Sequence, residues 1–370
     1  MTTTIEMTRS NVALAKMTSM IEAGKSRAAR GLEALSTEWK LRKDTMVKPA
    51  TIEVEVVREP KADPTMKLRS RVSGRSYNLT GHSRGQLLSM AGVPVRFADD
   101  LIDYRMDDLL KENVRRLIDR NAADGILVRE VQGTVKGILS PSYRRMDAAP
   151  LFESFVEAAT RTGLVPHSGE VTDTRAFLSF LQPQVVELLP GEHVVFAVEL
   201  RGSDYGNGAV DLALSIWRLL CSNGMIGTSL FRKVHLGRRF EGFGEGDVVR
   251  LSDATVNLDT KTIASGMRDV MKALPAQIGG MTAAIREQAT GEVDVNAALA
   301  KLNKAGLRKA TLEKVKSLYE ATEQPVEALP EMPGKWRLSN VLSLIANGTP
   351  DGDEAHDLRE LAASPFKLSA

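Results

Sequence analysis

The chain has 370 residues, of which 43% are hydrophobic and 26% are charged, and its formal net charge is +2. Such a composition can bury a core, and the near-neutral charge excludes a uniformly basic protein that coats polyanions by charge alone. A length above about 200 residues leaves open one large core with helical additions or two domains. The single cysteine excludes an internal disulfide and a cysteine-based zinc cage, which fits a reducing compartment.

Nothing in the sequence indicates an export signal or a membrane segment. Residues 1–10 are polar, without the apolar stretch of a signal peptide. No window approaches the roughly 20 apolar residues that span a bilayer. We therefore expect a cytoplasmic protein that makes no membrane contact.

Hydrophobic periodicity separates an α+β part from a helical part. Up to residue 241 it predicts helices over 11–38, 82–90, 94 or 97 to 121, and 148–162. It predicts strands over 51–57, 68–79 (with a turn at 73–75), 126–140 (a hairpin), 164–170, 175–181, 193–200, 210–221 and 228–236. After residue 246 it predicts helices over 261–288, 295–322, 336–346 and 358–363. We therefore expect an α+β fold with a central, mostly antiparallel, curved sheet and packed helices, followed by a helical C-terminal region.

The chain divides into three expected units. The best boundary is the flexible stretch Gly242-Phe243-Gly244-Glu245-Gly246. The units are an N-terminal helical segment over 1–50, an α+β core domain over 51–241, and a helical C-terminal region with an acidic tail over 247–370.

Two segments look like nucleotide-binding loops, and neither fits. Residues 23–26 read Ala-Gly-Lys-Ser, but Ser19 stands where a phosphate-binding loop requires glycine, and no strand precedes it. Gly202, Gly206 and Gly208 precede a predicted strand, where a dinucleotide site needs a helix N-terminus. We therefore expect no nucleotide cofactor.

The hairpin over 126–140 leads into a segment that suits a nucleic-acid backbone. Tyr143, Arg144 and Arg145 follow it directly, and Asp147 can cap the helix that comes next. An aromatic ring can stack on a base, guanidinium groups can pair with phosphates, and a helix start offers free amides. The alternative is that Tyr143 packs on the helix while the arginines lie in water.

A second predicted hairpin holds the only cysteine. An Asn223-Gly224 turn joins its strands and places Arg218 and Lys233 near its middle. His235 can approach Cys221, but a lone cysteine is usually a small buried hydrophobe, and no oxyanion-hole signal accompanies the pair. The five histidines show no metal-ligand spacing, so we expect no metal and no other cofactor.

Several of these segments resemble a phage- and plasmid-encoded family described as domain of unknown function 932. The likeness covers about residues 81–346 and is carried by Gly92-Val93-Pro94, the stretch 138–147, Trp217-Arg218-Leu219-Leu220-Cys221-Ser222-Asn223-Gly224-Met225, the stretch 233–237 and Trp336-Arg337-Leu338-Ser339-Asn340. Arg201-Gly202-Ser203-Asp204 departs from the family pattern of a small polar residue and an asparagine. The resemblance implies a mobile-element protein in the host cytoplasm, expressed with replication or recombination functions and without established catalytic residues.

The order of hairpin, helix and antiparallel strands is also loosely similar to single-strand annealing proteins of the RecT and Erf kind. That likeness concerns the fold, and a fold does not fix a function.

The leading hypothesis is a non-enzymatic DNA-binding protein, a homo-oligomer that prefers single strands and acts in recombination or replication. Neutralisation of phosphates by basic side chains would give an affinity that depends on salt, and one tyrosine would offer a ring on which a base can stack. The residues expected to line one concave track are Lys136, Tyr143, Arg144, Arg145, Arg218, Arg232, Lys233, Arg238 and Arg239.

Two alternatives belong to other classes of function. One is an anti-defence or host-takeover factor that binds a host protein through the acidic tail and the helical C-terminal half. The other is an enzyme that depends on Cys221 and His235.

Overall fold

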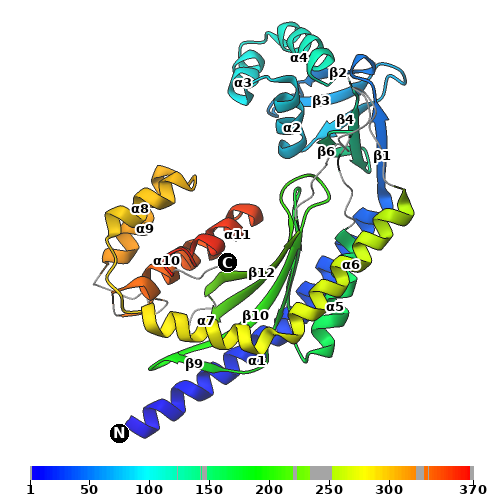
Figure 1. The fold of residues 1–370 in the computed structure, drawn as a ribbon. Helices are drawn as coiled ribbons and strands as arrows, with labels where there is room; N and C mark the ends of the chain where they lie inside the picture. Colours follow the sequence, from blue (N-terminus) through cyan, green and yellow to red (C-terminus); the bar gives the residue numbers. More distant parts are fainter. Residues whose placement is uncertain are drawn as a thin grey trace, which may run out of the picture.

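The chain builds two β-sheets, each with its own helices, and this confirms the α+β class (Figure 1). The computed structural model describes residues 2–122, 124–141, 143, 148–219, 223–233, 252–321, 329–331 and 333–366. In the view of Figure 1 the first sheet lies in an upper lobe, residues 42–139, and the second in a lower lobe, which comprises the N-terminal helix and the described chain from residue 148 onward.

The upper lobe is a six-stranded sheet in the order β1-β5-β6-β4-β3-β2, in which only the pair β4 and β6 is parallel. Its helices pack on the sheet and share a core with it, in which Leu87, Leu110 and Ile118 are fully or almost fully buried. Its elements are β1 (Arg42–Val47), β2 (Ile52–Val57), β3 (Thr65–Ser70), β4 (Ser76–Leu79), α2 (Gly81–Ala91), α3 (Val95–Asp103), α4 (Asp107–Asn121), β5 (Ile126–Val131) and β6 (Thr134–Leu139).

The lower lobe is an antiparallel sheet in the order β12-β11-β10-β8-β7, with β9 paired to β10. Helices from both ends of the chain share its core. Its strands are β7 (Val165–Val171), β8 (Ala176–Leu181), β9 (Val186–Leu189), β10 (Glu192–Gly202), β11 (Val210–Arg218) and β12 (Asn223–Lys233). Its helices are α1 (Thr2–Leu41), α5 (Ala148–Arg161), α6 (Asp253–Lys272), α7 (Leu274–Gln288), α8 (Val295–Lys304), α9 (Lys309–Glu320), α10 (Lys335–Asn347) and α11 (Gly352–Leu361).

Helix α1 packs unusually close to strand β7. A Cβ atom added at Gly24 would lie 2.5 Å from the carbonyl oxygen of His167, and one added at Gly31 would lie 2.6 Å from the carbonyl carbon of Gly169. Only glycine allows two backbones to approach in this way. The glycine of the rejected phosphate-loop motif therefore serves helix–strand packing.

Several predicted elements are confirmed, and three of the predicted helices are each divided into two. Gln132 and Gly133 have φ angles of 51° and 86°, so the turn of the first hairpin is of the predicted tight type. The predicted helix that ends at residue 121 is two helices, because Arg105 has a φ of 59° and turns the chain between α3 and α4. Residues 261–288 likewise belong to two helices, α6 and α7, with Pro275 in the first turn of the second.

The strands differ from the prediction at β1, at β9 and at the start of β12, and the tail differs in one place. The segment predicted over 68–79, with a turn at 73–75, forms β3 and β4, whereas the sequence did not predict β1 or β9. Asn223 and Gly224, predicted as a turn, lie in β12 and pair with Arg218 and Trp217. The tail was expected to be mobile over 349–354, but Asp351 caps α11 by accepting a hydrogen bond from the backbone N–H of Glu354.

The hydrophobic cores do not coincide with the three expected units. Ala28 and Leu35 of α1 belong to the lower core, which the C-terminal helices share, while the upper lobe has a core of its own. The expected core domain over 51–241 thus contributes to three hydrophobic clusters, one in the upper lobe and two in the lower lobe. The expected boundary at 242–246 lies outside the described residues.

Candidate functional site

The two lobes meet at the loop between β10 and β11, residues 203–209. Asp204 is buried in this loop, and its carboxylate accepts hydrogen bonds from Nη1 of Arg42 at 3.1 Å and from the backbone N–H of Ala148 at 3.0 Å. Its main-chain oxygen accepts a further hydrogen bond from the guanidinium of Arg129. One loop residue therefore connects the first and fifth strands of the upper sheet with the start of α5.

Arg129 is the most deeply buried charge at this junction, with 0% of its side chain exposed. Its Nε and Nη2 donate to the two carboxylate oxygens of Asp44, both at 2.8 Å. Burial alone would lower the pKa of Arg129, but the carboxylates of Asp44 and Asp204 outweigh it and raise that pKa. The guanidinium carbon lies 5.9 Å from the centre of the Tyr143 ring, within cation–π range.

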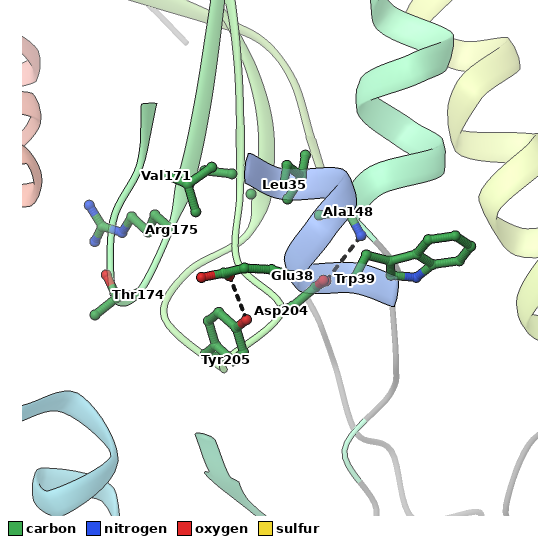
Figure 2. A pocket seen from close by; sticks show the side chains of 11 residues that line it. Leu35, Glu38, Trp39, Ala148, Val171, Thr174, Arg175, Asp204 and Tyr205 are labelled. Atoms are coloured by element: carbon green, nitrogen blue, oxygen red, sulfur yellow. Dashed lines mark hydrogen bonds between the residues drawn. The ribbon is translucent and has the colours of Figure 1, made fainter. Parts of the chain in front are cut away.

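Tyr205 is the second anchor of the junction. Its hydroxyl donates to Oε2 of Glu38 at 2.8 Å, and Figure 2 shows this bond below the end of α1. Lys136 donates to the other oxygen of Glu38, and its Nζ lies 5.6 Å from the Tyr205 ring. The main-chain oxygen of Tyr205 is 2.9 Å from Nε2 of His82 and accepts from Nε2 of Gln86 at 2.8 Å. Burial, and then the Glu38 carboxylate, raise the pKa of Tyr205.

Two hollows adjoin these residues. The cavity in Figure 2, whose lining includes Leu35, Glu38, Ala148 and Tyr205, measures about 10 Å³, which is room for at most one water molecule. A wider open recess of about 600 Å³ lies along α2 beside His82. No group of three potential metal-ligating side chains occurs among the residues that the structure describes. The junction is therefore a buried polar contact between the two lobes.

The structure brings some of the expected DNA-binding residues to the junction end of the molecule. Lys136 and Tyr143 lie in the junction itself, where burial is the main cause that raises the pKa of the tyrosine. Lys233 pairs in register with Val210, directly after the junction loop, and its neighbour Arg232 is exposed. Lys136 is bound to Glu38, so it is not available to a phosphate without breaking that contact.

Arg218 lies elsewhere. It stands eight residues from Val210 along β11, which is about 26 Å at the rise of a β-strand. Its side chain is buried, and its Nη2 donates to Glu192 at 2.8 Å. Arg218 therefore does not share one track with the residues at the junction.

The remaining expected residues fall outside the part of the chain that the structure describes. They are Arg144, Arg145, Arg238 and Arg239, together with Cys221 and His235 of the enzyme alternative.

The described residues include a set of exposed cations that the sequence analysis did not single out. The α8–α9 hairpin, residues 295–320, carries six cations and two carboxylates and so has a net charge of +4. All six cations are exposed, and none forms an ion pair with a described residue: Lys301, Lys304, Arg308, Lys309, Lys314 and Lys316. The signal was present as basic residues between the leucines of this segment, but a whole-chain charge of +2 concealed it.

A second buried charged cluster lies beneath α11. Glu199 of β10 and His356 of α11 form a buried hydrogen-bonded pair, and the Phe177 ring lies 3.7 Å from the imidazole. Burial would raise the pKa of Glu199, but His356 outweighs it and lowers that pKa. Arg201 adds ion pairs to Asp211 and Glu360. Because these charges are paired with one another, the cluster fixes α11 on the sheet.

No protein-family model, curated protein or solved structure matches this chain. The resemblance to the domain of unknown function 932 and the looser likeness to RecT and Erf proteins therefore stay predictions. In the described part of the chain no helix has both the length and the apolar character needed to cross a bilayer.

Proposed function

We propose that the protein binds nucleic acid without catalysing a reaction, and that the α8–α9 hairpin makes the main contact with the phosphate backbone. The six exposed cations of this hairpin, none of which forms an ion pair with a described residue, are the observation that carries the proposal. Each cation that neutralises a phosphate releases condensed counterions, so affinity comes from local charge even when the whole chain is nearly neutral.

The end of β12 offers a second, smaller contact. Arg232 is exposed and Lys233 is half-buried, and neither has an ion pair with a described residue. Lys136 and Arg218 are held by Glu38 and Glu192, so their part in the expected track is structural. Nucleic acid thus remains the proposed ligand, but the main interface lies on the C-terminal helices instead of the expected track.

We still expect single-stranded nucleic acid as the ligand. The expected process is recombination or replication of a phage or plasmid. Cations on a helical hairpin contact any phosphate backbone, whereas a preference for single strands requires stacking of bases on exposed aromatic rings. The binding experiment therefore compares single-stranded with double-stranded oligonucleotides.

The decisive measurement is the fluorescence anisotropy of a labelled oligonucleotide, titrated with the protein between about 50 and about 200 mM salt. Six phosphate contacts to a single strand predict a slope of log affinity against log salt of about −4. A variant with Lys304→Glu, Arg308→Glu and Lys309→Glu should lose roughly tenfold or more in affinity, and its slope should weaken by about 2.

The matched control reverses three exposed cations of another helix, with Lys16→Glu, Lys25→Glu and Arg30→Glu on α1. It changes the net charge equally but leaves the hairpin intact, so its affinity should fall much less. Equal losses in the two variants, or an affinity that does not depend on salt, would contradict the proposal. Circular dichroism checks that both variants keep their helices.

The other candidate functions have less support. The acidic tail expected to contact a host protein is used inside the molecule, since Asp353 accepts from Thr172 at 3.1 Å and Asp357 pairs with Arg175 at 2.8 Å. The enzyme alternative stays an untested prediction, because its two residues lie outside the described chain.

A further inference from the structure

Exposed apolar side chains gather where α3 meets α4, a region that we call the α3–α4 corner and define as residues 95–109. Among the described residues, eleven large apolar side chains are exposed, and five of them lie in these fifteen positions: Val95, Phe97, Tyr104, Met106 and Leu109. Tyr104 is 72% exposed and Phe97 43%. Clusters of this kind on a protein surface mark interaction sites.

The fold explains why these side chains are not needed inside. α3 already buries Leu101 and Ile102 in the upper core. Phe97 and Tyr104, seven residues apart, share one side of the helix, at the edge of its buried face. The turn at Arg105 then starts α4 directly beside Tyr104, so Met106 and Leu109 continue the exposed surface. The core therefore gains nothing from these groups, and only a partner can bury them.

The corner is also acidic. Five aspartates and two arginines give residues 95–109 a net charge of −3. Arg84 binds Asp99 and Arg58 binds Asp107. Asp100, Asp103 and Asp108 are exposed and form no ion pair with a described residue. A partner for this surface must combine apolar contact with positive charge.

The α8–α9 hairpin has that combination at its tip. Ala305 and Gly306 are exposed small residues, and Lys304, Arg308 and Lys309 flank them. Small residues let the backbone approach an aromatic ring, and cations beside them can pair with aspartates and lie over the Tyr104 ring. A net charge of +4 on the hairpin faces −3 on the corner.

We propose that the α3–α4 corner docks on the α8–α9 hairpin of a second copy of this chain. In one copy the two surfaces belong to different lobes and are clearly separated in Figure 1, and the buried junction holds these lobes in place. A reciprocal exchange between two copies repeats the contact twice and closes a two-fold dimer, whereas a one-way contact extends into a chain of copies. The inference does not depend on nucleic-acid binding, although both would use the same hairpin.

The test is a charge-swap experiment, in which mass is measured against concentration by analytical ultracentrifugation at low salt and without nucleic acid. The corner variant carries Asp100→Lys and Asp103→Lys, and the hairpin variant carries Lys304→Glu and Arg308→Glu. The wild-type chain should associate as its concentration rises. Each variant alone should associate at least about tenfold more weakly, because the exchanged side chains then face groups of like charge.

Mixing the two variants in equal amounts restores opposite charges at both kinds of contact, so the mixture should recover association as a mixed complex. A third variant, Lys25→Glu with Arg30→Glu on α1, controls for net charge and should associate like the wild-type chain. A wild-type chain that stays monomeric at every concentration, or a mixture that does not recover, overturns the proposal. The corner variant leaves the hairpin cations intact, so its loss of association with unchanged oligonucleotide affinity separates this inference from the proposed function.

Discussion

The imidazole of His167 shows how α1 controls the chemistry of a single residue. The side chain is buried, its Nδ1 lies 3.4 Å from Oγ of Ser179, and its ring centre lies 4.5 Å from that of Trp217. Burial, with a smaller effect from the charge of Arg27, lowers the pKa of His167 to about 4. At neutral pH the folded protein therefore holds a neutral imidazole there.

This pKa predicts an acid-sensitive stability. The unfolded chain takes up the proton of His167 near pH 6.5, and the folded chain only near pH 4. The free energy of unfolding should thus lose up to about 3 kcal/mol from this group as the pH falls through that window. A His167→Gln variant should lose less between about pH 7 and about pH 4.5, as measured by urea unfolding. If the free energy of unfolding of the two proteins changed in parallel with pH, the acid sensitivity would not come from His167.

At the level of elements, the contact between α1 and β7 depends on the absence of side chains. Gly24 and Gly31 sit in the middle of a helix, where alanine is normally the better residue by about 1 kcal/mol. Their positions against the backbone of β7 leave no room for a methyl group. The two glycines therefore lower the helix propensity of α1 but allow it to pack closely on β7.

The Gly31→Ala variant should therefore destabilise the protein, by about 1–3 kcal/mol through overpacking, although alanine favours the helix. Gly279→Ala in α7 is the matched control, because no atom lies within 4 Å of the added Cβ and the change should stabilise by about 0.5–1 kcal/mol. Thermal unfolding of both variants measures whether the two changes in stability have opposite signs. A stabilised Gly31→Ala variant would mean that α1 does not rest on β7.

The sequence predicted those elements that are marked by local pattern. Alternating apolar residues identified β2, and the Gln132-Gly133 turn identified the first hairpin. β1 escaped prediction because Arg-Lys-Asp-Thr-Met-Val does not alternate, and its strand form depends on pairing with β5 and on the bond between Asp44 and Arg129. The turn at Arg105 escaped because a positive φ at an arginine has no sequence signal.

At the scale of the whole molecule, the junction determines how the lobes sit. Asp204 accepts hydrogen bonds from Arg42, Arg129 and the start of α5, so it links both lobes through one residue. The sequence could show the charges of the candidate site but not their partners. Lys136 lies 98 residues from Glu38, and only the folded chain reveals that the two are paired.

Asp204→Ala should loosen the junction by leaving the buried Arg42 guanidinium without this carboxylate. Breaking a buried ion pair from one side costs about 3–5 kcal/mol. The radius of gyration from small-angle X-ray scattering should increase as the lobes separate, and the unfolding midpoint in urea should fall. Arg69→Ala, which removes an exposed ion pair with Glu53 in the upper lobe, is the control and should change the midpoint little. An unchanged scattering curve for Asp204→Ala would show that other contacts set the orientation.

Helix α1 runs directly into β1, and this continuity determines how the two lobes are connected in sequence. The upper lobe leaves the lower lobe after Leu41 and returns at Ala148, and Trp39 and Ala148 line the same small cavity. In chain order the upper lobe thus lies between two segments of the lower lobe whose ends are neighbours. Removing the upper lobe and joining Leu41 to Ala148 with a short glycine-serine linker should leave a lower lobe that still folds. A single cut between Leu41 and Ala148 would instead place α1 on a different fragment from the rest of the lower core.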